Sequence, residues 1–153
     1  MSAPTKAANS PFTATSGQLA TFRLDGDLYG VEVEHVQEVL RSQQLTRVPL
    51  APSAVAGLIN LRGQVVTAIE LRERLGRPPR PEGTDAVVIV VRLHGEAVSL
   101  LVDSIADVVD VDANDFEAPP DTLEGPARVL IRGAYKLDGQ LLLALDVHKA
   151  VSA

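Results

Sequence analysis

Short segments in which apolar and polar residues alternate follow one another along the chain, separated by turn residues. One such pair spans residues 19–33 and has Asp25-Gly26-Asp27 at its centre; another spans residues 58–71, around Arg62-Gly63-Gln64. Alternation with a period of two is typical of strands with one buried face, and glycine between two such strands favours a tight turn. The pattern therefore predicts two antiparallel hairpins in the first half of the chain.

A third hairpin is predicted over residues 87–102, with its turn at His94-Gly95. Its strands are almost uniformly apolar, which indicates that both faces are covered. After the first and third hairpins the apolar spacing changes to i, i+3, i+4, at Val36, Val39 and Leu40 and again from Ile105. That spacing predicts one helical turn packed on the core, with continuation of the strand as the competing interpretation.

The two halves of the chain repeat each other. Arg23-Leu24-Asp25-Gly26 returns 69 residues later as Arg92-Leu93-His94-Gly95, and the apolar positions that follow also correspond. Gly57 and the Gly63-Gln64 turn return 76 residues later as Gly133 and Gly139-Gln140. Chance agreement of apolar residues would not reproduce the glycines, so the chain is a duplicated unit whose second copy has seven extra residues in its middle loop.

Many short strands with turn-rich connections predict a mainly β fold of two small packed barrels. Short helices are expected at residues 71–75 and, at the C-terminus, near residues 146–151. We expect one half over about residues 18–76, a proline-rich linker over 77–83, and the other half over about 84–151. Residues 1–17 lack the apolar run of a signal peptide and are expected to form a disordered leader. Whether the halves exchange strands stays open.

Composition excludes several classes of function. The formal charge of −6 and the pI near 5.0 argue against a nucleic-acid partner or an anionic membrane surface, because both require clustered basic residues. No run of about 18 apolar residues is present, so no insertion into the membrane is expected. Without cysteine the chain has neither disulfides nor thiolate metal sites, which is compatible with the cytoplasm. Aromatic residues make up only 3%, so Val, Leu, Ile and Ala must build the core.

No catalytic or metal-binding pattern is found. His35, His94 and His148 lack the spacing that places two ligands on one helical face, and are interpreted as separate surface histidines. Asp110-Val111-Asp112-Ala113-Asn114 matches the start of a calcium-binding loop, but the required glycine is replaced by Asp115. No nucleotide-binding or nucleophile motif occurs. We therefore expect no enzyme activity, no cofactor and no metal.

Several motifs together resemble the CheW family, the adaptors of bacterial chemotaxis. They are Tyr29-Gly30-Val31, Val36-Gln37-Glu38-Val39, Thr46-Arg47-Val48-Pro49, Gly57-Leu58-Ile59-Asn60-Leu61-Arg62-Gly63 and Leu101-Val102-Asp103. The resemblance covers about residues 18–151, and Asn-Leu-Arg-Gly is its most specific part. It implies two SH3-like five-stranded barrels related by a pseudo-twofold axis. Thr67 and Glu70 depart from it, because the family commonly has Pro and Asp there.

The resemblance also implies partners and a site. Family members couple the cytoplasmic tip of methyl-accepting chemoreceptors to the regulatory domain of the histidine kinase CheA, without catalysis, in the cytoplasm at membrane receptor arrays. The aliphatic residues that it places at the receptor-binding groove are Val31, Val33, Val36, Val98 and Val108. The residues that it places on the kinase and receptor interaction surface are Glu38, Gly57, Arg62, Gly63 and Gly133, with Glu38 and Arg62 expected to face each other.

Two alternatives remain from the sequence. The same scaffold could serve a non-flagellar chemosensory pathway of motility, biofilm formation or development. A small barrel that binds nucleic acid or proline-rich peptides would need a basic groove or an aromatic platform, and the chain has no Trp. The first alternative keeps the fold and changes only the pathway, whereas the second is disfavoured by composition.

Overall fold

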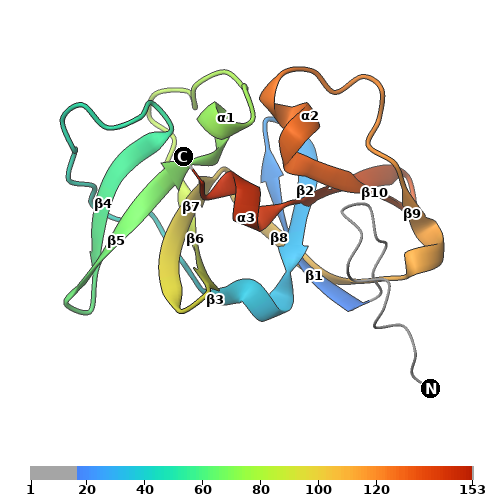
Figure 1. The fold of residues 1–153 in the computed structure, drawn as a ribbon, viewed down its shortest axis with the longest axis horizontal. Helices are drawn as coiled ribbons and strands as arrows, with labels where there is room; N and C mark the ends of the chain where they lie inside the picture. The colour runs from blue at the N-terminus through green and yellow to red at the C-terminus, as the bar shows by residue number, and fades with distance from the viewer. Residues whose placement is uncertain (1–16, 153) are drawn as a thin grey trace.

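The computed structural model describes residues 17–152 and shows a mainly β protein built on two sheets (Figure 1). The predicted leader lies outside the described residues, except for Gly17. The elements are β1 (Gly17–Leu24), β2 (Asp27–Glu32), η2 (Val33–His35), β3 (Val36–Leu40), β4 (Val55–Leu61), β5 (Gln64–Glu70), α1 (Leu71–Arg74), β6 (Val87–Leu93), β7 (Glu96–Val102), β8 (Ser104–Val111), η3 (Ala113–Asp115), β9 (Phe116–Glu117), α2 (Pro126–Leu130), β10 (Ile131–Leu137), β11 (Gln140–Leu145) and α3 (Val147–Ala150).

The two halves of the sequence exchange strands. One sheet has the order β3-β6-β7-β5-β4 and the other β8-β1-β2-β11-β10-β9. With the offsets of the repeat, the first five strands of each order correspond one to one, so both sheets have the same topology. Each takes one hairpin from each copy, joined by a parallel pair, β5 with β7 or β11 with β2. The predicted mainly β fold of two small SH3-like barrels with short helices is confirmed as two sheets of matching topology, and the short strand β9 adds a sixth strand to one of them.

Three clusters of buried side chains hold the sheets. The main cluster takes residues from both sheets and from all three α-helices, and includes Phe22, Tyr29 and Val91. Each of the two smaller clusters belongs to a single sheet, one around Leu142 and one around Ile59. Burial of aliphatic surface is the dominant stabilising contribution, and the main cluster lies where the two sheets meet. Residues Val88 to Val91 of β6 are all buried, as the uniformly apolar third hairpin predicts.

The helical turns predicted at Val36–Leu40 and after Ile105 are wrong, since these residues form β3 and β8. A bulge explains the misleading spacing. Val36 and Val39 pair with Val91 and Ile89, so three steps on β3 match two steps on β6. The extra residue puts apolar side chains three apart on the same face. The register of β8 on β1 shifts at the equivalent place, whereas the predicted helical turns after β5 and β11 form α1 and α3.

The two copies pack equivalent positions with compensating volumes. Gly30 in one sheet corresponds to Ser99 in the other, and both positions are buried. A Cβ on Gly30 would lie 3.1 Å from Leu142 Cδ1 and 3.2 Å from Leu19 Cδ1. The residues equivalent to Leu142 and Leu19 beside Ser99 are the smaller Val66 and Val88, which leaves space for the serine side chain.

Removing the Ser99 hydroxyl should stabilise the protein. Within residues 17–152 Ser99 Oγ has no hydrogen-bond partner, and the residue is fully buried. Because a buried unpaired hydroxyl loses its hydration without replacement, we expect Ser99→Ala to raise the free energy of unfolding by about 1 kcal/mol. Gly30→Ala, the matched change in the other sheet, should lower it by about 1 kcal/mol through overpacking. Urea denaturation measures both, and a destabilised Ser99→Ala variant would contradict this packing account.

Candidate functional site

Arg62 and Glu38 form an exposed bidentate ion pair, as the sequence led us to expect. Arg62 Nη1 donates to Glu38 Oε2 at 2.8 Å and Arg62 Nη2 donates to Oε1 at 2.7 Å. Arg62 and Gly63 are the central residues of the β4–β5 turn, with φ of 52° and 85°. Two successive positive φ angles define the hairpin turn that matches strand twist, and glycine adopts the second without strain. The turn therefore presents the arginine at the end of the hairpin.

The pair joins opposite edges of the five-stranded sheet. Glu38 lies on β3, the edge strand at one end of the order, and Arg62 follows β4 at the other end. The hydrogen bonds from the Arg62 guanidinium lower the pKa of the Glu38 carboxyl, and Glu38 in turn raises the pKa of Arg62. Arg62 keeps 75% of its side chain exposed, so its outer face remains accessible to another protein.

Two of the three glycines assigned to the interaction surface, Gly57 and Gly133, are buried and have a packing reason of their own. A Cβ on Gly57 would lie 2.6 Å from the Thr46 carbonyl oxygen, because Thr46 pairs with Leu58 in an isolated bridge. A Cβ on Gly133 would lie 2.5 Å from the Glu117 carbonyl oxygen and closer still to Phe116. At repeat-equivalent places, glycine thus lets another backbone segment pair with a bulged strand.

The valines assigned to the groove differ in their accessibility. Val31 is buried in the main cluster at 1% exposure, so a partner does not contact it directly. Val36 and Val98 are half-buried against the same cluster and lie in one row across the sheet, on either side of Val91. Val33 is half-buried in η2, and Val108 on β8 is 56% exposed. The structure thus brings Val36 and Val98 onto one face.

Two further aliphatic residues on the edge strands are exposed and were not assigned to the groove. Val39 on β3 is 45% exposed and Ile105 on β8 is 41% exposed. Val39 and Val108 are equivalent in the repeat and pair with the equivalent residues Ile89 and Ala20. Both repeat-related edge strands therefore present aliphatic side chains to solvent. Their spacing in the sequence contained this signal, but it was interpreted as core packing.

A half-buried polar network connects segments that are distant in the sequence. Arg72 of α1 donates from Nε to Asp103 Oδ1 at 2.9 Å and from Nη2 to Oδ2 at 2.6 Å, and from Nη1 to the Pro78 carbonyl at 2.8 Å. Asp103 also accepts from the Asp25 backbone N–H. The hydrogen bonds from Arg72 lower the pKa of Asp103. This network ties α1, the residue between β7 and β8, and the β1–β2 turn together.

Glu70, one of the departures from the family pattern, has a local structural role. Its carboxylate accepts from the Arg72 N–H at the start of α1 and pairs with Arg80 at 2.9 Å. Glu70 and Arg80 line a cavity of about 400 Å³ together with residues of the 42–56 segment. The ion pair keeps both of these side chains together in the wall of the cavity.

The sequence is similar to a family of known proteins. The family described as CheW-like domain matches residues 18–153. A chemotaxis protein CheW from Treponema pallidum is 30% identical over 140 residues, covering 89% of this chain and 82% of that protein. A chemotaxis protein CheW from Bacillus subtilis is 29% identical, covering 88% and 86%.

Two further similarities bear on fold and on pathway. The crystal structure of scaffolding protein TtCheW from Thermoanaerobacter tengcongensis superimposes with a TM-score of 0.80 at 28% identity, covering 91% of this chain and 94% of that one. Protein PilI of Pseudomonas aeruginosa is 25% identical over 114 residues, covering 74% of this chain and 64% of that protein. Among residues 17–152, no helix is long and apolar enough to cross a membrane.

Proposed function

The chain belongs to the CheW-like domain family, and on that premise we propose that it is a non-catalytic adaptor which couples transmembrane chemoreceptors to a CheA-like histidine kinase. It would act in the cytoplasm at membrane receptor arrays, with the kinase regulatory domain and the receptor tip as its partners. The observation that carries the proposal is the pair of repeat-related edge strands, β3 and β8, which expose Val39, Ile105 and Val108.

Aliphatic side chains on an edge strand suit an amphipathic helix of a receptor tip. Anchors at i, i+3 and i+7 of such a helix would replace water on Val36, Val98 and Val108. The exposed Arg62 at the end of the β4–β5 hairpin supplies a charged contact for the kinase regulatory domain. Single contacts of this size give weak affinity, because association entropy offsets most of the gain. Weak contacts suit an array, in which many of them act together.

Binding of purified partners tests the proposal. The full chain, mixed with a receptor-tip fragment and a CheA regulatory domain, should elute with both from a size-exclusion column. Val36→Asp should remove the receptor fragment from the complex, because a carboxylate at this half-buried position would lose its hydration on binding. Asp110→Asn, an exposed change on the other edge strand, β8, is the control. Failure of the unmodified chain to bind either partner would refute the adaptor role.

A second candidate changes the pathway and keeps the scaffold role. The similarity to a protein with a different name, PilI, favours a non-flagellar chemosensory pathway that governs motility, biofilm formation or development. Deletion of the gene distinguishes the two. Loss of swimming bias with normal surface behaviour supports the flagellar pathway, and the reverse supports the alternative.

A further inference from the structure

The three histidines of the chain, which the sequence presents as separate surface residues, converge at one place. The ring centroids of His35 and His148 are 5.5 Å apart, and those of His94 and His148 are 5.2 Å apart. They come from three different elements: η2, the β6–β7 turn and α3. The ring of His148 therefore neighbours both of the other imidazole rings.

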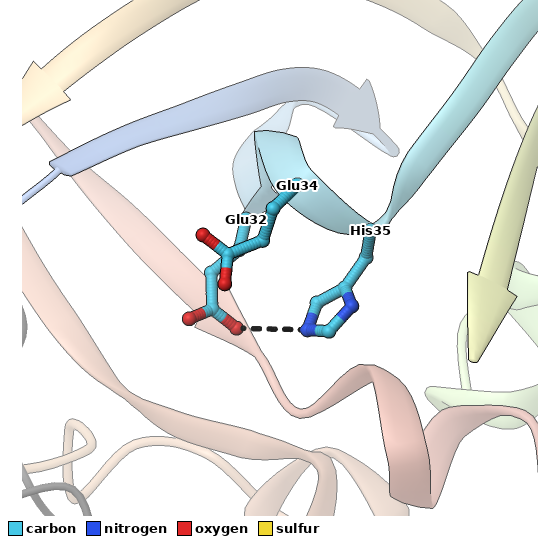
Figure 2. Close-up of side chains that lie close together, drawn as sticks. All are labelled: Glu32, Glu34 and His35. Atoms are coloured by element: carbon cyan, nitrogen blue, oxygen red, sulfur yellow. Dashed lines mark ion pairs between the residues drawn. The ribbon is translucent and has the colours of Figure 1, made fainter. Parts of the chain in front are cut away.

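Two carboxylates join the histidines. Glu32, Glu34 and His35 each offer a ligand atom, and these atoms all lie within 4.8 Å of one another. His35 Nε2 is 3.4 Å from Glu32 Oε1, and the three side chains extend to the same side of η2 (Figure 2). Glu32 and His35 are shielded, with 30% and 22% of their side chains exposed. Partly shielded donors lose less on binding an ion than donors that are fully hydrated.

The internal repeat shows what the equivalent place in the other copy does. The repeat offsets relate His94 to Asp25, His148 to Arg72, and Glu34 to Asp103. There the Arg72 guanidinium is the cation at the centre, bound by Asp103, which also accepts hydrogen bonds from the Asp25 backbone N–H and from Arg80 Nε. The central arginine is replaced by histidine at the His148 site, while one acidic residue, Glu34, is kept on η2. The fold thus places a cation-bridged junction at one position and leaves a set of ligands at the other.

We propose that Glu32, Glu34 and His35 bind a divalent transition-metal ion of the zinc type, with His148, whose ring neighbours that of His35, as the fourth ligand. Two imidazoles on one tetrahedral Zn²⁺, with Zn–N bonds of about 2.0 Å, hold their ring centroids roughly 5 Å apart, and adjacent ligand atoms lie about 3.3 Å apart. The 5.5 Å between the His35 and His148 rings and the 3.4 Å between His35 Nε2 and Glu32 Oε1 agree with this geometry.

The donor types select the metal. Imidazole nitrogen suits Zn²⁺, Ni²⁺ and Cu²⁺, whereas Ca²⁺ and Mg²⁺ require sets of oxygen ligands. Arg132 lies 3.7 Å from Glu32 and competes with a cation there, so we expect an affinity in the micromolar range. Bound metal would link α3 to η2 beside Val98, which lines a cavity of about 290 Å³ with His94 and His148.

Titration of the full, tag-free chain with Zn²⁺ alone tests the site. The chain has three histidines and no cysteine, so imidazole NMR signals report on this cluster without ambiguity. We expect Zn²⁺ to shift the His35 and His148 ring signals, Mg²⁺ to leave them unchanged, and calorimetry to give one ion per chain. His148→Ala should weaken binding at least about tenfold, since it removes a direct ligand. Asp112→Asn, in the acidic loop after β8, should leave the affinity unchanged.

The outcome of the Zn²⁺ titration does not depend on the adaptor role, because no signalling partner is present in the experiment. If His148→Ala alters the fold, His35→Gln and Glu34→Gln provide the same test on η2, and circular dichroism shows which variants remain native. Zn²⁺ affinity that is equal in the His35→Gln/His148→Ala double variant and in the unmodified chain would overturn the proposal. Unchanged ring signals at saturating Zn²⁺ would do the same.

Discussion

Reversing the charge of Arg62 is expected to weaken binding to the kinase regulatory domain by at least about tenfold while the fold stays native. The guanidinium lies at the end of the β4–β5 hairpin with 75% of its side chain exposed. Its partner Glu38 is on the other edge strand, so Arg62→Glu removes the charged contact and also places two like charges together. Titration calorimetry with the purified regulatory domain measures the affinity, and circular dichroism checks the fold.

A charge swap shows whether Arg62 contacts the kinase domain directly or only holds the hairpin to β3. The Glu38→Arg/Arg62→Glu double variant restores an internal ion pair with the charges exchanged. If Arg62 contacts the partner directly, the double variant should bind as poorly as Arg62→Glu. Recovery of binding would instead mean that the pair acts only by holding the hairpin to β3. Lys136→Glu is the matched control, because Lys136 forms an exposed pair with Glu117 on the other sheet.

Loss of the Arg72 side chain is expected to destabilise the protein by about 2 to 4 kcal/mol. Arg72 is 7% exposed, and its removal leaves Asp103 and the Pro78 carbonyl without their principal donor. Of its two cation partners Asp103 then keeps only Arg80, at 3.2 Å, so its half-buried carboxylate carries a larger desolvation penalty. Urea denaturation of Arg72→Ala measures the loss. Arg47→Ala, which removes an exposed arginine of the loop before β4, should change stability little.

The pH dependence of unfolding provides an independent check on the same network. Because the pKa of Asp103 is lowered in the folded state, its contribution is fully present above the ordinary carboxyl value of about 3.9 and is lost as the pH falls through the lower folded value. Stability should therefore decline below about pH 4 in the unmodified chain. In Arg72→Ala this decline should be shallower. An equal loss of stability below pH 4 in both proteins would show that the ion pair of Arg72 and Asp103 does not contribute to the stability of the fold.

The local pattern of apolar and polar residues was sufficient to predict the hairpins and the repeat. It was not sufficient to predict the edge strands. The glycine turns at Gly26, Gly63 and Gly95 all form, since each supplies the positive φ that a two-residue turn requires. At Val36 and Ile105 a bulge inserts one residue, so the apolar period changes from two to three and imitates a helix. A bulge is set by pairing with a distant strand, which a local pattern does not contain.

The exchange of strands and the meeting of the histidines depend on tertiary arrangement. Both copies carry the same apolar pattern, so β5 could pair equally well with its own copy or with β7 of the other. His35, His94 and His148 show no common spacing because three different elements supply them. The repeat offsets nevertheless contained a usable signal, since they relate His148 to Arg72 and His94 to Asp25, which take part in one network. Equivalent positions in a duplicated fold can be expected to meet in both copies.

The adaptor role is tested most directly by kinase activity in reconstituted receptor membranes. Receptor, CheA-like kinase and this chain are combined, and kinase autophosphorylation is followed with and without the receptor ligand. We predict that the ligand changes kinase activity only when the chain is present, and that Arg62→Glu fails to replace it. Receptor control of the kinase that is equally strong without the chain would contradict the account.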